Sequence, residues 1–362
     1  MSSSRVTMKD IAAKVGVSVN TVHKAISNKP GVSDAVRAQI MQCAEEMGYR
    51  RNESASILRR RDLRVVVCLP SSEQEGSFYF AYLWRGIERY AAETRDNGMV
   101  FELRPFEIGS YQKVLSQVLA ECEEGRVPDG VIAYAPVEDG TCELVTSIAE
   151  AGASLVLVDG DRPHTGRLGA TVAAYAEAGN LMAEQAVNLL PGVRGAKKVL
   201  LLAGDPHTDS HADVARAFHA YFDERGLDYA VYDLHGAHAQ VDELRTQLHS
   251  LLAADDVPGL VCSVFAVGSE VTADTLMELG LAGKVSVIAS DLFPENAEAM
   301  RRGVFTNIVY KDPVGIAYRG AQMLGNCLLK GEAPAQSVQR GSVELVFRSN
   351  LDQYCRLAGV EA

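Results

Sequence analysis

The hydrophobic and polar positions follow two patterns along the chain, and the change falls near residue 63. Before that point, short apolar stripes of helical period end at Gly16, Pro30 and Gly48, which predicts three short helices. After it, apolar runs such as "LRVVVCLP", "GVIAYAP" and "KKVLLLAG" alternate with amphipathic stretches. This alternation predicts parallel sheets covered by helices on both faces.

The second of the three predicted helices has one apolar and one polar side. Val22, Ala25 and Ile26 form the apolar side. At about 100° per residue, the other side carries Asn20, Lys24 and Ser27, with His23 on its flank. Three short helices, the first two joined by a tight glycine turn, are typical of a helix-turn-helix module, whose second helix enters the major groove. A solvated face on an ordinary small helical domain is the alternative interpretation.

Each of these helices has a candidate cap. Thr7 stands three residues before Asp10, as in a capping box, while Ser18 and Ser33 precede the second and third apolar stripes. Serine and threonine at these positions can accept a hydrogen bond from the first free backbone N–H groups. The first helix is therefore expected to start after Thr7, the second after Ser18 and the third after Ser33.

Charge is distributed unevenly between the two parts. Residues 1–64 hold twelve Lys and Arg and six Asp and Glu, a net charge of +6; the whole chain carries -12, so the remainder carries -18. A basic head on an acidic body indicates that the head meets a polyanion. The seven cysteines are scattered singly without CxxC spacing, which argues against a disulfide framework and against a zinc finger.

The segment "VTMKDIAAKVGVSVNTVHKAISNKPGVSDAVRAQIMQCAEEMGYRRNESASILRRR", residues 6–61, resembles the headpiece of the lactose and galactose repressor family. The resemblance implies that Val19, Asn20 and Lys24 read base edges, where asparagine can pair with adenine and lysine can reach guanine. It also implies a hinge helix over residues 55–59 that inserts Leu58 into the minor groove and kinks the DNA. The candidate DNA contacts are Thr7, Ser18, Val19, Asn20, Thr21, His23, Lys24, Asn28, Ala55, Leu58 and Arg59.

The headpiece departs from the family pattern at a few positions. Ser56 stands where the family usually has an arginine, Arg51 stands where it has a proline, and His23 and Lys24 replace the commoner Ser-Arg pair. These changes affect the operator sequence that is read rather than DNA binding itself.

The alternating pattern after residue 63 predicts a second domain of two similar wound α/β lobes. This arrangement resembles the sugar-binding fold of periplasmic binding proteins. The organisation expected is a helix-turn-helix headpiece over residues 1–50, a linker with a hinge helix over 51–62, and a two-lobed domain for effector binding and dimerisation over 63–362. Lobe 1 is expected over roughly 63–168 and 309–340, and lobe 2 over roughly 169–308 and 341–350.

Ligands of wound sheets bind outside the carboxyl ends of the strands. The residues just after the predicted strands combine aromatic rings with carboxylates, a lining that suits a polyhydroxylated ring. Phe265 and Tyr134 could equally be core residues, whereas a buried carboxylate at Asp159 or Asp291 would be costly without a partner, which favours a ligand role. The candidate effector contacts are Phe78, Phe80, Tyr134, Asp159, His207, Asp213, Phe265, Asp291 and Tyr310.

The resemblance is incomplete in this cleft. Many members of the family carry an arginine that binds the effector at the position of Val214, and Arg216 is expected to face away from the cleft. A neutral sugar or polyol, or a cationic ligand, is therefore favoured over an anionic effector. The run "DPHTDSHAD" places His207 and His211 four residues apart, a spacing that can hold a metal, but helix capping and ligand contact are the preferred interpretation. No metal or cofactor is expected.

The prediction from these patterns is a ligand-controlled transcription regulator, most simply a repressor of a carbohydrate uptake or catabolic operon. It would bind a near-palindromic double-stranded operator as a homodimer, in the cytoplasm and without a membrane contact. The alternatives are a regulator of the same type whose effector is a nucleoside or a cationic small molecule, or one that responds to a protein partner. Nucleotide-binding loops, the GxSxG elbow and HExxH are absent from the sequence, which argues against an enzyme. An exported sugar-binding protein would need a signal peptide and no basic head.

Overall fold

The computed structural model describes residues 6, 8–26, 31–47, 62–73, 78–135, 138–192, 198–227, 229–236 and 240–360. Contacts divide the chain into two compact units, Met1–Arg61 and Asp62–Ala362. The division falls within the range where the sequence predicts a linker.

The described residues of the N-terminal unit contain three helices, α1 (Met8–Val15), α2 (Val19–Ile26) and α3 (Asp34–Glu46). Ile11, Val22 and Ile40, one from each helix, are fully buried and form the centre of its core. Gly16 adopts φ of 76° between α1 and α2, a conformation that glycine reaches without steric cost. The turn therefore brings the apolar stripes of α1 and α2 together against α3.

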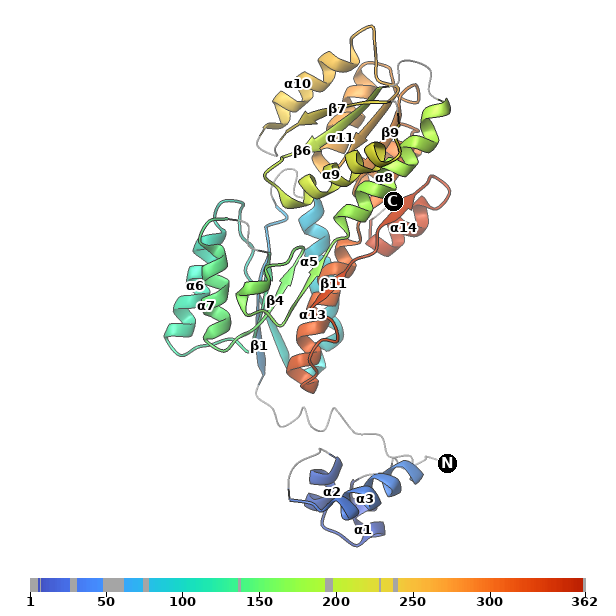
Figure 1. Ribbon diagram of the computed structural model, residues 1–362. Helices are drawn as coiled ribbons and strands as arrows, with labels where there is room; N and C mark the ends of the chain where they lie inside the picture. The colour runs from blue at the N-terminus through green and yellow to red at the C-terminus, as the bar shows by residue number, and fades with distance from the viewer. Residues whose placement is uncertain are drawn as a thin grey trace. The chain divides into compact units, whose positions relative to one another are not determined.

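The first lobe of the larger unit is a parallel sheet with the strand order β11-β5-β4-β3-β1-β2. Both of its faces are covered, because α5 (Phe78–Thr94) and α13 (Pro313–Lys330) pack on one face while α6 (Tyr111–Glu123) and α7 (Thr141–Glu150) pack on the other (Figure 1). This explains the continuous apolar runs of the central strands. The strands are β1 (Leu63–Cys68), β2 (Met99–Leu103), β3 (Gly130–Tyr134), β4 (Ser154–Val158), β5 (Gly169–Val172) and β11 (Val338–Arg340).

The second lobe repeats this architecture with the strand order β12-β10-β9-β8-β6-β7, in which only the β10–β12 pair is antiparallel among the described strands. The strands are β6 (Lys198–Gly204), β7 (Ala230–His235), β8 (Leu260–Ser263), β9 (Ser286–Ser290), β10 (Asn307–Tyr310) and β12 (Glu344–Val346). The helices are α8 (Tyr175–Leu189), α9 (Asp209–Glu224), α10 (Val241–Leu252), α11 (Ala266–Glu278), α12 (Pro294–Arg301) and α14 (Leu351–Ala358).

The chain crosses between the lobes at residues that differ from the lobe boundaries predicted from the sequence. Residues 169–172 form β5, which pairs with β4 and so belongs to the first lobe, although the sequence pattern predicts that the second lobe begins at 169. Residues 309–310 belong to β10 of the second lobe, although the sequence pattern predicts that the chain returns to the first lobe at 309. Both shifts have one cause: a short strand joins the sheet with which it makes hydrogen bonds, and the run of apolar residues does not reveal that partner.

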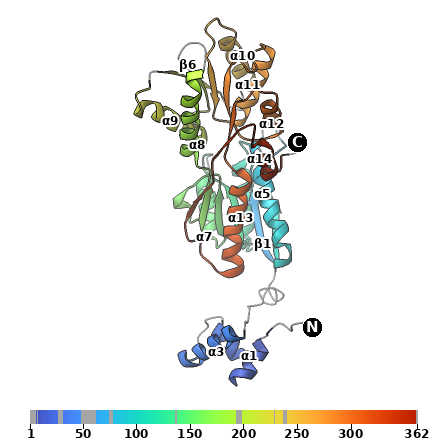
Figure 2. The same ribbon diagram turned by 90° about the vertical axis from the view of Figure 1, so that its right-hand side faces the viewer.

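Each lobe contains one closely packed pair of helices, α5 with α13 in the first lobe and α8 with α9 in the second (Figures 1 and 2). A Cβ atom on Gly86 of α5 would lie 2.3 Å from the carbonyl oxygen of Val314, and one on Gly179 of α8 would lie 2.3 Å from that of Val214. These glycines let the helix backbones approach one another. Val214 is consequently buried against α8.

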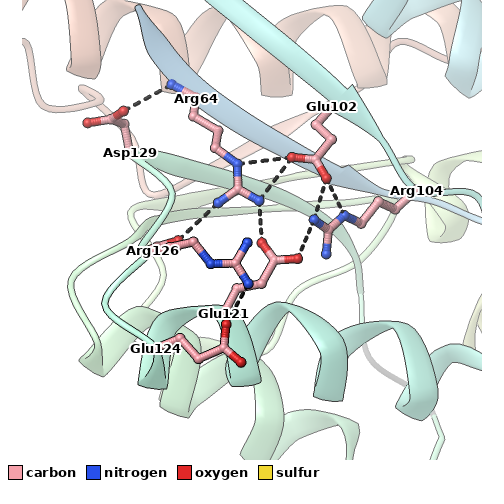
Figure 3. A network of polar contacts seen from close by, with 7 residues as sticks. All are labelled: Arg64, Glu102, Arg104, Glu121, Glu124, Arg126 and Asp129. Carbon is pink, nitrogen blue, oxygen red and sulfur yellow. Dashed lines mark hydrogen bonds and ion pairs between the residues drawn. The ribbon is translucent and has the colours of Figure 1, made fainter. Parts of the chain in front are cut away.

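A network of ion pairs joins β1, β2 and α6 at the side of the first sheet (Figure 3). Arg64 and Arg104 are interleaved with Glu102 and Glu121, and Glu121 Oε1 lies 2.7 Å from Arg104 Nη2. The backbone N–H of Arg64 also donates to Asp129 Oδ2 at 2.9 Å. The network therefore fixes the start of β1, the strand that follows the linker.

The seven cysteines all lie in described segments and make no disulfide; Cys142 and Cys327 are partly exposed and the others are buried. None of the helices in the described ranges is long and apolar enough to cross a membrane.

Candidate functional site

The exposed side of α2 is the candidate DNA-reading surface. Val22 and Ala25 anchor the helix in the core. Val19 is 42% exposed, Asn20 is exposed and Lys24 is half-buried. A solvent-exposed valine can contact a thymine methyl group, and a neighbouring asparagine can hydrogen-bond to the edge of an adenine.

Ser18 positions the start of this helix. Its Oγ accepts a hydrogen bond from the backbone N–H of Thr21 at 3.1 Å and lies 2.8 Å from Thr21 Oγ1. At the other end, Arg37 of α3 donates from Nη1 to the carbonyl oxygen of Ala25 at 2.9 Å. Ser33 occupies the N-cap position of α3, but its side chain makes no capping hydrogen bond.

Several predicted DNA contacts lie outside the described residues. These are Thr7, Asn28, Ala55, Leu58 and Arg59, together with the side chain of His23. The hinge helix and the capping box at Thr7 therefore stay predictions.

A pocket of about 680 Å³ lies between the two lobes of the larger unit. Val172, Val338 and Arg340 of the first sheet form one part of it, close to the crossing into α8. The first turn of α8 contributes Tyr175, and the first turn of α9 contributes Asp209. These elements all meet at the carboxyl ends of the strands, where wound sheets bind ligands.

Three of the nine predicted effector residues line this pocket, namely Tyr134, Asp159 and Asp213. Phe80 stands edge-on to Tyr134 with ring centroids 5.9 Å apart, and Phe78 stacks on Phe293 of the second lobe at 4.5 Å. His207 is exposed beside the pocket's α9 side. The remaining three, Phe265, Asp291 and Tyr310, are buried and do not line the pocket.

The side of α9 that faces the pocket differs from the one expected. Asp209, Asp213, Arg216, Ala217 and Ala220 line the pocket, and their spacing is that of one helical stripe. Arg216, expected to face away, donates from Nη1 to Asp213 Oδ1 at 2.6 Å. The expectation was wrong because it took the position of Val214 as the ligand-facing side, and that side packs against α8.

Asp159 forms the centre of a buried polar cluster. It is 8% exposed, adopts φ of 65°, and its Oδ1 accepts hydrogen bonds from Tyr79 Oη at 2.7 Å and Tyr175 Oη at 2.5 Å. Burial raises the pKa of Asp159 to about 6, and the tyrosine hydroxyls oppose the rise by stabilising the carboxylate. Tyr175, which was not among the residues predicted from the sequence to contact the effector, thus supports the carboxylate that faces the pocket.

Asp291 has a partner that the sequence did not reveal. It is 7% exposed, and Oδ1 lies 3.2 Å from Nζ of Lys311, which is 5% exposed. The ammonium also donates to Ser290 Oγ at 3.1 Å. Burial raises the pKa of Asp291, and Lys311 partly offsets that rise. The carboxylate predicted to bind an effector is therefore already paired with a residue of the chain.

Ion pairs surround the pocket. Arg162 of the first lobe donates from Nη2 to Asp209 Oδ2 of the second at 2.9 Å, so that one pair spans the two lobes. Asp161 receives two hydrogen bonds from Arg167, one of them at 2.7 Å from Nη2 to Oδ2. Charged lining of both signs can orient a polar ligand but offers little to an apolar one.

His211 of the histidine pair packs against its own lobe. His211 Nδ1 accepts from the backbone N–H of Asp205 at 3.1 Å, and its ring lies 5.0 Å from that of Phe265. Among the described residues, no group of three or more His, Cys, Asp and Glu side chains could hold a metal ion.

Comparison with known proteins identifies the family. The model of the lacI family of bacterial regulatory proteins matches residues 7–52, and the model of the periplasmic binding protein domain matches residues 67–333. The chain therefore carries a lacI-family helix-turn-helix domain at its N-terminal end and, over most of its length, belongs to the periplasmic binding protein domain family, which confirms the resemblance and the fold class predicted from the sequence. Its relatives are transcription regulators and not enzymes.

Individual relatives match over part of their length. The transcriptional regulator MalR of Streptococcus pneumoniae serotype 4 is 28% identical over 144 residues, which cover 39% of this chain and 42% of MalR. The chain thus spans about two fifths of the length of this curated relative. The ribose operon repressor of Haemophilus influenzae is 31% identical over 91 residues, 25% of this chain and 27% of that protein.

A solved structure shares the fold of the two lobes. A solute-binding protein of an ABC transporter from Burkholderia graminis, in complex with D-arabinose, superimposes with a TM-score of 0.70 at 17% identity, covering 81% of this chain and 98% of that one.

Proposed function

We propose that this protein is a ligand-controlled repressor that acts in the cytoplasm as a homodimer on a near-palindromic operator. The observation that carries the proposal is the presence in one chain of a lacI-type helix-turn-helix domain and a two-lobed domain with a pocket of about 680 Å³ between its lobes. Two headpieces related by a two-fold axis would read half-sites about one helical turn apart.

The effector in this proposal is a sugar or polyol. Tyr134 and Tyr175 offer aromatic surface for C–H groups, while Asp159 and Asp213 offer acceptors for hydroxyl groups. The D-arabinose bound by the related fold from Burkholderia graminis supports this class of ligand.

In this proposal, the effector controls DNA binding by changing how the two lobes are arranged relative to each other. The chain passes between the lobes after β5, β10 and β11, so a ligand that binds both lobes favours one arrangement of them. A ligand shifts this equilibrium only by the difference of its affinities for the two arrangements. The linker joins the headpiece to β1, the first strand of the first lobe. A change in the arrangement of the lobes would therefore reach the headpiece through the linker and change its affinity for DNA.

Selection of DNA from a random duplex pool, followed by thermal melting against sugars and polyols, tests the proposal. A ligand that prefers the folded protein raises the melting temperature. We expect the same compound to change the affinity for the selected duplex by about tenfold, corresponding to a coupling of about 1.4 kcal/mol. A chain that selects no palindromic sequence, or a ligand that leaves DNA affinity unchanged, would contradict the proposal.

A further inference from the structure

The charges that line the interlobe pocket are almost fully paired within the protein. Four carboxylates line it, and each has a partner. Asp161 pairs with Arg167, Asp209 with Arg162 and Asp213 with Arg216, while Asp159 accepts from Tyr79 and Tyr175. These carboxylates therefore offer little additional attraction to a cationic ligand.

Arg340 differs from the other charged residues of this lining. Within the described segments, no hydrogen bond or ion pair of its guanidinium is found, and the side chain is exposed. It ends β11, where it stands opposite Val172 of β5 in the parallel pair. Val338 lies two residues before it and so on the same face of the strand, and both residues line the pocket. The position of Arg340 is fixed by the ladder, while its donors stay available.

We propose that the effector is an acidic sugar or polyol, whose carboxylate or phosphate binds Arg340 while its hydroxyl groups bind the Asp159 side of the pocket. The inference rests on the proposed function and narrows its ligand class. Arginine suits this role because its planar donors match the oxygens of a carboxylate or phosphate in a bidentate geometry.

This inference reverses an expectation drawn from the sequence. The lack of an arginine at position 214 favoured a neutral or cationic effector, because in the family that residue binds the ligand. In the structure, the pocket receives arginines from elsewhere: Arg162 follows β4, Arg216 lies on α9 and Arg340 ends β11. Arg340 is the one whose charge is not already matched by an aspartate among the described residues.

Matched pairs of ligands provide the test on the full-length protein. Each pair consists of a neutral parent and its acid, such as D-glucitol with D-gluconate and D-galactose with D-galacturonate, and each hexose is also compared with its 6-phosphate. Calorimetric titration at constant ionic strength measures the affinities. We expect an acid or a phosphate to bind about tenfold more tightly than its neutral parent, the size of one charge-assisted hydrogen bond. The acid and phosphate arms distinguish the two sources of negative charge.

Arg340→Gln is the decisive variant. It should reduce the affinity for the anionic ligand to that of the neutral parent, and leave the affinity for the parent unchanged. Arg340→Lys, which keeps the charge but not the fork of donors, should restore part of the difference. Arg302→Gln is the matched control, because Arg302 lies on the surface of the second lobe and pairs with Glu298 at 2.8 Å. Melting of each variant without ligand verifies its folding.

The outcomes separate the two proposals. A neutral sugar that binds while its acid and phosphate do not overturns this inference and leaves the proposed function standing. Equal binding of an anionic ligand by Arg340→Gln and the unaltered protein also overturns it. If no sugar, polyol or acid binds, the effector class of the proposed function fails and this inference fails with it.

Discussion

Arg162 in the first lobe and Asp209 in the second form an ion pair, with Nη2 and Oδ2 separated by 2.9 Å, and both residues line the interlobe pocket. Asp209 lies in the first turn of α9, while Arg162 follows β4. The pair therefore joins the lobes at the site where an effector is proposed to bind. Under the proposed function, a bound effector would contact the same two side chains that link the lobes.

Asp209→Asn should weaken the association of the lobes. The pair is partly exposed, with 31% of the Arg162 side chain and 70% of the Asp209 side chain accessible, so its contribution is at most about 1 kcal/mol. This corresponds to a shift of about fivefold in the equilibrium between lobe arrangements. Spin labels placed in the two lobes would report longer distances. Asp223→Asn, an exposed change further along α9, serves as control; equal distance distributions in both variants would argue against a role of the pair.

Asp159→Asn should remove a pH dependence of stability. The pKa of Asp159 is raised from 3.8 to about 6, so the folded state binds its proton more tightly than the unfolded state. This contribution to stability is therefore fully present below about pH 3.8 and is lost, by about 3 kcal/mol in all, as the pH rises through about 6. Both tyrosines donate to Oδ1, an atom that asparagine retains. Urea unfolding at pH 7 should show the variant to be more stable; a less stable variant would contradict this account.

Lys311→Met should destabilise the second lobe strongly. The change leaves Asp291 buried without its cation, which typically costs about 3–5 kcal/mol. Lys311→Met combined with Asp291→Asn removes both charges and should recover most of the loss. Chemical denaturation of the single and double variants measures the coupling. Lys284→Met, at an exposed position, should have little effect, and a double variant no more stable than Lys311→Met would show that the pair is not the cause.

Glu121→Gln should weaken the network beside β1 (Figure 3). The Glu121 side chain is largely buried and contacts both Arg64 and Arg104, so we expect a loss of about 1–3 kcal/mol. Burial by itself would raise the pKa of Glu121, but the two arginines hold it below its ordinary value of 4.5. Its contribution to stability is therefore present above pH 4.5 and lost as the pH falls below it.

Glu124→Gln is the control in the same network, because Glu124 is exposed and pairs with Arg126 alone among the described residues. It should change stability by less than about 1 kcal/mol. Acid unfolding followed by circular dichroism compares the two variants. Equal acid sensitivity of Glu121→Gln and the unaltered protein would exclude Glu121 as the titrating group.

Lys24→Ala should weaken binding to the selected operator by about 1–3 kcal/mol and relax specificity at one base pair. The reason is the placement of Lys24 on the side of α2 opposite Val22. Fluorescence anisotropy with the selected duplex and its single-base variants measures both effects. Uniform weakening across all duplexes would instead identify Lys24 as a phosphate contact. Lys14→Ala, which removes a charge on α1 that lies 3.7 Å from Glu46, is the control for loss of charge.

The hydrophobic pattern was sufficient for the main elements. The three helices of the headpiece and the central strands β1, β3, β4, β6, β8 and β9 follow from apolar residues at helical spacing or in continuous runs, because burial of those residues is itself what forms the elements. The pattern missed β5 and β11. Val338–Arg340 contains two polar residues in three, and it becomes a strand only because β5 offers it hydrogen bonds.

The candidate site shows the same division. The sequence by itself determined that Tyr134 and Asp159 stand at the ends of strands, since the ends of apolar runs can be read directly. Only the tertiary structure decided that Lys311 pairs with Asp291 and that Arg340 enters the interlobe pocket. Partners such as Arg162 and Asp209 are 47 residues apart, and the lobe crossings bring them together. Local periodicity carries information over one element, whereas charge pairing depends on which elements the folded chain places side by side.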